Sequence, residues 1–149
     1  MLSTTVALQA LVKEGSDLLR TDDLLKVKFV RGGRDVATGL DCYGLCKEVY
    51  KRLGIDLPEY DSPDSRETVD SVVQSQKGEF ERLEQPLSYS FVLFSIRPPY
   101  ESHIGIVLED KKRFIHMLEG TGCSIERLDS MFWRKRIRGY FKWNSNKFS

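Results

Sequence analysis

Three residues of this chain have the side-chain types that a nucleophilic hydrolase needs: Cys42, His103 and His116. Cys42 follows Asp41 at the start of a helical pattern, so its thiol is expected in the first turn of a helix. Unpaired backbone N–H groups and the positive end of the helix dipole stabilise an anion there, and we expect a lowered pKa for the Cys42 thiol. The alternative is that Cys42, like Cys46, is a small apolar residue facing the core.

The chain has 2 histidines, and both fall in one predicted hairpin. A tight turn at Asp110 and Lys111 places His103 opposite Leu118. His116 is then a diagonal neighbour of His103 on the same sheet face, at roughly 7 to 8 Å. Taken singly, each histidine would be a polar residue at a sheet margin; together on one face they indicate a functional pair.

With Cys42 presented by its helix against that face, the three side chains would form a relay. Cys42 would be the nucleophile, His103 the base and then the acid, and His116 the group that orients His103. Backbone N–H groups at Cys42 and a neighbour would form the oxyanion hole. A zinc site made by Cys42, Cys46 and the two histidines is the competing interpretation. Structural zinc cysteines usually come from turns at closer spacing, which favours the relay.

The elements that must position these residues change type halfway along the chain. Apolar residues at helical spacing predict helices over 5–20 and from Asp41 to Gly54. Short apolar runs separated by turn residues predict five strands, over 91–96, 103–108, 113–118, 124–128 and 136–143. Residues 1–27 are interpreted as an N-terminal helical extension, and 59–87 as a polar insertion with one or two weak helices. Helices followed by strands indicate an α+β domain in which the nucleophile helix packs on an antiparallel sheet of about five strands.

Composition limits the function classes. A chain of 149 residues, 40% hydrophobic, is expected to form a single domain over 1–149. Lys and Arg number 23 against 22 Asp and Glu, so no overall field would gather nucleic acid or an anionic membrane. No apolar run approaches the roughly 18 residues of a membrane span. The 3 cysteines and the apparent lack of an export signal favour free thiols and synthesis in the cytoplasm.

Four segments together carry a resemblance to the NlpC-type cell-wall cysteine peptidases. They begin with the Phe-Val-Arg-Gly-Gly-Arg-Asp run from Phe29 and the Gly-Leu-Asp-Cys-Tyr-Gly-Leu run from Gly39, which continues to Pro58. Ser-His-Ile-Gly-Ile-Val from Ser102 and Phe-Ile-His from Phe114 follow in the same order and spacing. The match extends from Lys28 to about Tyr140. The Gly-Gly-Arg-Asp loop, Tyr43 in place of a common Ser, and the Gly-Ile-Asp-Leu-Pro-Glu-Tyr ending are most similar to the branch in phage tails and prophages.

The resemblance implies a papain-like fold and hydrolysis of peptidoglycan stem peptides, typically at the bond between γ-D-glutamate and a diamino acid, with no cofactor. It implies Cys42 as nucleophile, His103 as base and His116 as the third polar residue. The residues that it places along the substrate groove are Asp41, Tyr43 and Ser102. Other phage tail proteins would be partners, and a virion tail would carry the protein to the wall.

Two departures from the family pattern keep an alternative open. Phe29 stands where many members have a tyrosine, and the Gly-Asp pair that commonly precedes the first core strand is missing before Phe91. The alternative is a catalytically weak or inactive structural tail-assembly protein with the same fold. A transferase or amidase using the same relay is another. Aromatic and basic residues interleaved over 131–142 are interpreted as a final amphipathic strand, with tail-subunit docking or polyanion binding as alternatives.

Overall fold

The computed structural model describes residues 20–59, 80–96 and 103–143. In chain order its elements are η1 (Leu24–Lys26), β1 (Arg34–Asp35), β2 (Gly39–Leu40), α2 (Cys42–Arg52), β3 (Phe80–Leu83), β4 (Phe91–Phe94), β5 (His103–Val107), β6 (Arg113–Leu118), β7 (Gly122–Arg127) and β8 (Ile137–Trp143). The predicted helix over 5–20 lies outside these residues except for its last position.

The main sheet has six antiparallel strands in the order β3-β8-β4-β5-β6-β7. The five predicted strands are present, and β3 adds a sixth inside the segment interpreted as a polar insertion with weak helices. That interpretation is wrong for Phe80–Leu83, which pairs with β8. The charged residues Glu81 and Arg82 of β3 are exposed, as is typical of an edge strand, and leave little apolar pattern to read.

The hairpin of β5 and β6 has the predicted register. Gly105 pairs with His116, and the same register places His103 opposite Leu118. The turn closes through Lys111, which has a φ of 63°, while the Asp110 carboxylate accepts the backbone N–H of the residues that follow. The prediction that both histidines share one face is therefore confirmed.

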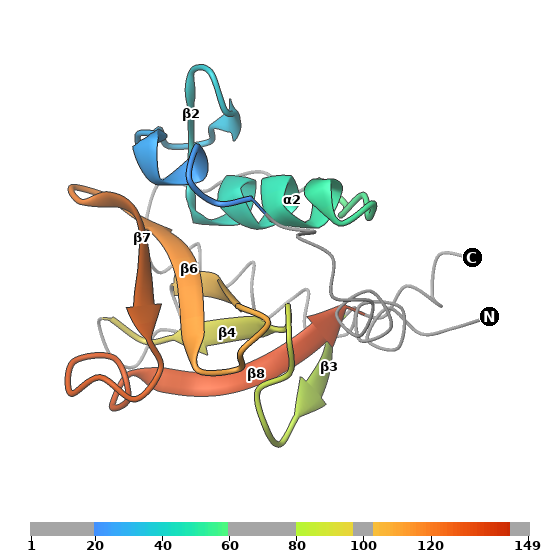
Figure 1. Ribbon diagram of the computed structural model, residues 1–149, viewed down its shortest axis with the longest axis vertical. Helices are drawn as coiled ribbons and strands as arrows, with labels where there is room; N and C mark the ends of the chain where they lie inside the picture. The colour runs from blue at the N-terminus through green and yellow to red at the C-terminus, as the bar shows by residue number, and fades with distance from the viewer. Residues whose placement is uncertain (1–19, 60–79, 97–102, 144–149) are drawn as a thin grey trace.

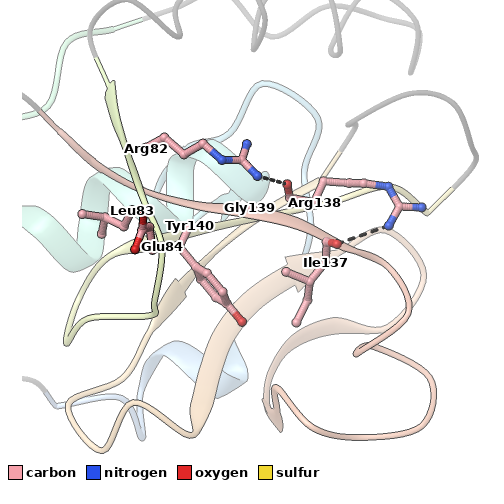
Figure 2. A pocket seen from close by; sticks show the side chains of 7 residues that line it. All are labelled: Arg82, Leu83, Glu84, Ile137, Arg138, Gly139 and Tyr140. Atoms are coloured by element: carbon pink, nitrogen blue, oxygen red, sulfur yellow. Dashed lines mark hydrogen bonds between the residues drawn. The ribbon is translucent and has the colours of Figure 1, made fainter.

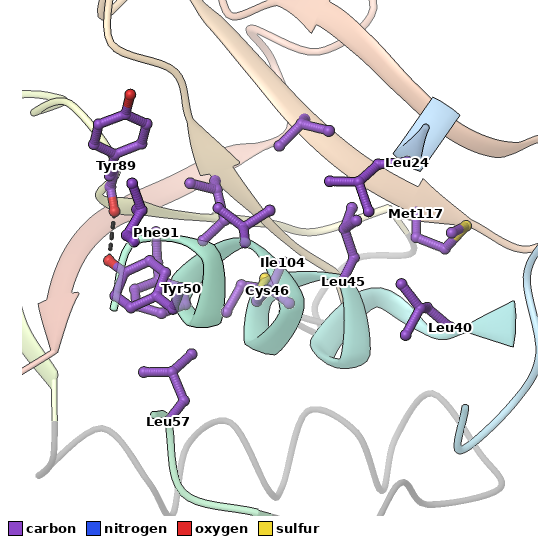
Figure 3. Close-up of a cluster of buried hydrophobic side chains, with 14 of the residues drawn as sticks. Leu24, Leu40, Leu45, Cys46, Tyr50, Leu57, Tyr89, Phe91, Ile104 and Met117 are labelled. Atoms are coloured by element: carbon purple, nitrogen blue, oxygen red, sulfur yellow. Dashed lines mark hydrogen bonds between the residues drawn. The ribbon is translucent and has the colours of Figure 1, made fainter. Parts of the chain in front are cut away.

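Helix α2 begins and ends where its sequence signals indicate. The Asp41 side chain accepts the Gly44 N–H at 2.7 Å, which is an N-cap bond, and Gly54 follows the helix with a φ of 85°. Its apolar side, with Leu45, Cys46 and Val49, packs on β5 and β6. Figure 1 shows α2 lying across one side of the sheet, and Figure 3 shows the side chains buried between them.

The two faces of the sheet carry different clusters. The helix-face cluster joins α2 to residues such as Ile104, Ile106 and Met117. The far-face cluster consists of Val92, Phe94, Val107, Phe114, Leu128 and Trp133. Side chains alternate along a strand, so consecutive residues of β5 lie on opposite faces of the sheet, and the same holds for β6. No helix in the described part of the chain is long and apolar enough to cross a membrane.

The predicted loop at Gly32 and Gly33 leads directly into a small hairpin of β1 and β2, which contacts α2. Residues 32–40 are called the glycine hairpin below. A Cβ on Gly33 would lie 2.3 Å from the Gly39 carbonyl oxygen, and one on Gly44 would lie 2.2 Å from the Gly33 carbonyl oxygen. Only glycine fits such approaches. These contacts fix the backbone on either side of Cys42.

Candidate active site

Cys42 is the first residue of α2, as predicted, and its sulfur faces backbone donors. The N–H groups of Tyr43 and of Ile104 lie against the sulfur, where each favours a negative charge. Ile104 is the second residue of β5, directly after His103. The helix start therefore meets β5 at the end of the strand where the predicted base is located.

The electrostatic setting of Cys42 differs from the expectation. Burial raises the pKa of the Cys42 thiol to about 12, and the neighbouring Asp41 carboxylate also raises it. Backbone donors and Arg34 oppose this change without reversing it. The expected lowering is wrong because desolvation and a nearby anion outweigh the helix terminus. The thiol is protonated at neutral pH, and a nucleophilic Cys42 requires a base.

Asp41 holds the start of α2 in place. Besides capping Gly44, its buried carboxylate accepts the Gly32 N–H at 3.1 Å and Arg34 Nη1 at 2.7 Å. Arg34 also reaches Glu59 at 2.6 Å. One carboxylate thus joins the glycine hairpin to the helix. Its location along a substrate groove stays a prediction.

Of the other two residues predicted for the groove, the structure describes Tyr43. The Tyr43 hydroxyl donates to the Pro58 carbonyl at 2.6 Å, and the Arg34 guanidinium lies 5.5 Å from the centre of its ring. Tyr43 is half-buried beside Cys42. Ser102 lies outside the described residues.

The two histidines contact each other directly. His103 Nε2 and His116 Nδ1 are 2.8 Å apart, and the residues are only 4% and 1% exposed. The indole of Trp133 stacks on the His103 ring at 6.0 Å and meets the His116 ring edge-on at 4.9 Å. Phe94 and Phe114 also pack against the pair. A hydrogen bond shielded in this way is stronger than one in water.

The imidazoles and the helix lie on different faces of the sheet. Both histidine rings contact the far-face cluster, whereas the apolar side of α2 packs on the helix-face cluster. The expectation that α2 would cover the histidine face is therefore wrong. The first residue of α2 meets the start of β5, through the contact of the Cys42 sulfur with the Ile104 N–H.

Sequence reasoning missed two polar groups on His116. Glu126 Oε2 is 2.5 Å from His116 Nε2, and Ser124 Oγ is 3.1 Å from the same nitrogen. Burial lowers the pKa of His116, and Glu126 opposes that lowering. The signal was present, because extending the hairpin register by one strand places Ser124 opposite His116.

A comparison with family models decides the family. The NlpC/P60 family model matches residues 26–142, which is most of the chain. The chain belongs to the NlpC/P60 family. Members of this family typically are cysteine peptidases or hydrolases, and the family covers peptidoglycan hydrolases. No curated protein matches the chain significantly.

Solved NlpC/P60 structures have the same fold. A lipoprotein-like NLP/P60 protein of Staphylococcus aureus matches at 26% identity and a TM-score of 0.58, over 83% of this chain and 40% of its own. An NlpC/P60 protein of Bacillus cereus matches at 21% identity and a TM-score of 0.58, over 85% and 41%. The NlpC/p60 domain of the peptidoglycan hydrolase SagA matches at 18% identity and a TM-score of 0.55, over 93% and 98%. The chain spans less than half the length of the first two.

The zinc alternative finds no support in the geometry of this NlpC/P60 member. Cys46 is fully buried in the helix-face cluster, on the other side of the sheet from both imidazoles. Among residues 20–59, 80–96 and 103–143, no three or more His, Cys, Asp or Glu side chains group as metal ligands. The four side chains of the proposed zinc shell do not converge.

A surface hollow lies elsewhere on the NlpC/P60 domain, between β3 and β8 (Figure 2). Arg82 and Arg138 contribute to its lining, and Arg82 donates to the Arg138 carbonyl at 3.2 Å. In the sheet order, β4 lies between β8 and the histidine-bearing β5, and Cys42, His103 and His116 are not among the residues that line the hollow. The hollow is therefore distinct from the Cys42 and histidine region.

Proposed function

We propose that the chain is a papain-like cysteine peptidase that cleaves peptidoglycan stem peptides, with Cys42 as nucleophile, His103 as base and His116 as the residue that orients His103. The observation that carries the proposal is the buried His103–His116 hydrogen bond, at the strand end where Cys42 meets the Ile104 N–H. Family membership supports the reaction class.

The raised pKa of the thiol explains why this chemistry needs His103. His103 takes the proton from Cys42 as the sulfur attacks the carbonyl carbon, and the amide breaks when His103 gives that proton to the departing amine. Water then attacks the thioester with His103 again as base, which releases the acid and restores the thiol. The Cys42 N–H, at the start of α2, has no intrahelical acceptor and would stabilise the oxyanion together with a neighbouring N–H.

The substrate part of the proposal rests on the family and on sequence motifs. The NlpC/P60 structure of SagA belongs to a peptidoglycan hydrolase. We propose the bond between γ-D-glutamate and a diamino acid, with Asp41, Tyr43 and Ser102 along the groove. Asp41 and Tyr43 flank Cys42 in the chain, which supports this part of the proposal.

Mass spectrometry of muropeptides tests this function. Purified muropeptides are incubated, with reductant and chelator, with the wild-type protein, Cys42→Ala and Cys123→Ala. Cys123 is a buried thiol on β7 and serves as the matched control. Fragments are expected from the wild type and Cys123→Ala and not from Cys42→Ala, and their masses identify the bond. Intact muropeptides with all three proteins would contradict the peptidase proposal.

A second proposal is association with a phage or prophage tail. The Gly-Gly-Arg-Asp loop, Tyr43 and the ending after Gly54 support it. In this setting the virion delivers a protein made in the cytoplasm, and other tail proteins are partners. An inactive structural subunit is the alternative, which Phe29 favours. Proteomics of particles purified from an induced lysogen tests the association, and absence of the chain from them contradicts it.

A further inference from the structure

Glu126 extends the histidine pair by a third group. Its Oε2 is 2.5 Å from His116 Nε2, and Ser124 Oγ lies 3.1 Å from that nitrogen and 3.4 Å from the same carboxylate oxygen. Ser124 pairs directly with His116 across the β6–β7 ladder, so Glu126 is its diagonal neighbour on the same face. The contact therefore follows from the register of two strands.

Donors and acceptors along this chain of groups can be assigned from chemistry alone. A carboxylate only accepts, so the proton between His116 and Glu126 belongs to His116 Nε2. A neutral imidazole carries one N–H, and His116 Nδ1 is then an acceptor. The nitrogen 2.8 Å away, His103 Nε2, must donate to it. The lone pair of neutral His103 is consequently on Nδ1.

The surroundings keep this arrangement in place. His116 is 1% exposed, and Trp133 and Phe114 pack against its ring. Within the described ranges, Glu126 is the charged side chain in contact with His116. Its carboxylate is half-exposed, so solvent reaches the outer end of the chain while the imidazoles stay shielded.

We propose that Glu126 is a positioning residue: it holds His116 as the Nε2–H tautomer, orients His103 with its Nδ1 as proton acceptor, and stabilises positive charge on the histidine pair. This inference rests on the proposed function, in which the acceptor serves the Cys42 thiol. Glu126 acts through His116 and touches no reacting atom.

The first test measures the alkylation rate of Cys42 by iodoacetamide across pH, resolved by peptide mass spectrometry, and needs no substrate. Glu126→Gln keeps the size of the side chain and removes its charge. It is expected to lower the rate at neutral pH about tenfold, the effect of a tenfold lower basicity of the pair, and to move the pH profile upward. Glu126→Ala is expected to lower it further.

Glu119→Gln is the matched control, because Glu119 is an exposed glutamate that pairs with Arg31 in the turn between β6 and β7. Cys42 of this variant is expected to be alkylated at the wild-type rate. Thermal melts of all variants show whether the fold is kept. A wild-type rate and pH profile in Glu126→Gln would overturn the inference.

The second test reads the tautomers directly from imidazole ¹⁵N chemical shifts at a pH where the histidines are neutral. The wild type is expected to show protonated Nε2 and bare Nδ1 on both rings, and Glu126→Ala to show mixed tautomers on His116. A purely structural Glu126 would leave the tautomers unchanged in every folded variant, and that result overturns the inference.

His103→Ala separates failure of this inference from failure of the proposed function. If His103→Ala slows alkylation of Cys42 and Glu126→Gln does not, the Cys42–His103 pair stands and the role of Glu126 is refuted. If neither variant changes the rate, the pairing of Cys42 with His103 fails as well.

Discussion

The two ends of the candidate site are held by different means. Cys42 is positioned by contacts close in sequence: the Asp41 cap, the glycine hairpin and Arg34. His103 and His116 are positioned by strand pairing and by an aromatic cover from the far face. The nucleophile end is fixed by local backbone geometry, and the base end by tertiary packing.

The difference extends to electrostatics. Around Cys42, burial and Asp41 raise the pKa of the thiol, so this end opposes the thiolate. At His116, burial lowers the pKa of the ring, whereas Glu126 favours the protonated ring and raises that pKa. We infer that the nucleophile end supplies position and the base end supplies the drive for proton transfer. Variants at each end test that division of roles.

The largest effect is expected from His103. Without a base, a thiol of raised pKa stays protonated, and His103→Gln is expected to lower peptide hydrolysis on the order of 10²- to 10⁴-fold. His116→Gln keeps the base and is expected to lose less. Steady-state hydrolysis of a muropeptide measures both. Near wild-type hydrolysis by His103→Gln would contradict the role of the base end.

Asp41 is expected to affect stability more than chemistry. Asp41→Ala removes the helix cap and leaves Arg34 without one carboxylate partner, at a cost of roughly 2–4 kcal/mol in the free energy of unfolding. Asp35→Ala is the control, because Asp35 is exposed and its side chain accepts a local N–H, from Ala37. Its expected cost is within about 0.5 kcal/mol. Urea denaturation measures both, and equal costs would contradict the structural role of Asp41.

Asp41→Asn sharpens the same point. Asparagine still caps the helix but carries no charge. Since the carboxylate raises the pKa of Cys42, its removal is expected to lower that pKa and to increase alkylation of Cys42 near neutral pH. Peptide-resolved alkylation rates check this. A slower reaction in a folded Asp41→Asn protein would mean that the anion does not oppose the thiolate.

The sequence predicts the elements whose signals are local. The Asp41 cap, the helix end at Gly54 and the register of the β5–β6 hairpin all follow from residues close in sequence. All three are confirmed. Strand β3 was missed because an exposed edge strand has little apolar alternation. Pairing a third strand, β7, with β6 would have identified Glu126 as a diagonal neighbour of His116. The stacking of Trp133 on His103 depends on how its loop folds back, which no local pattern encodes.

The smallest effect is expected from the protonation of His116. Burial lowers the pKa of His116 below that of an unfolded chain, which is about 6.5. Its contribution to stability is complete above that value and is lost as the pH falls through the lowered pKa, because the unfolded chain then binds a proton that the folded chain refuses.

Thermal melts from pH 7.5 to 5.5 measure this loss. The loss is expected to set in as the pH falls below about 6.5, where the unfolded chain begins to bind the proton. His116→Gln removes the titrating group, so its melting temperature should change less over the interval than that of the wild type. An equal slope in His116→Gln and the wild type would mean that His116 is not held neutral, and the acceptor role of its Nδ1 toward His103 would fail with it.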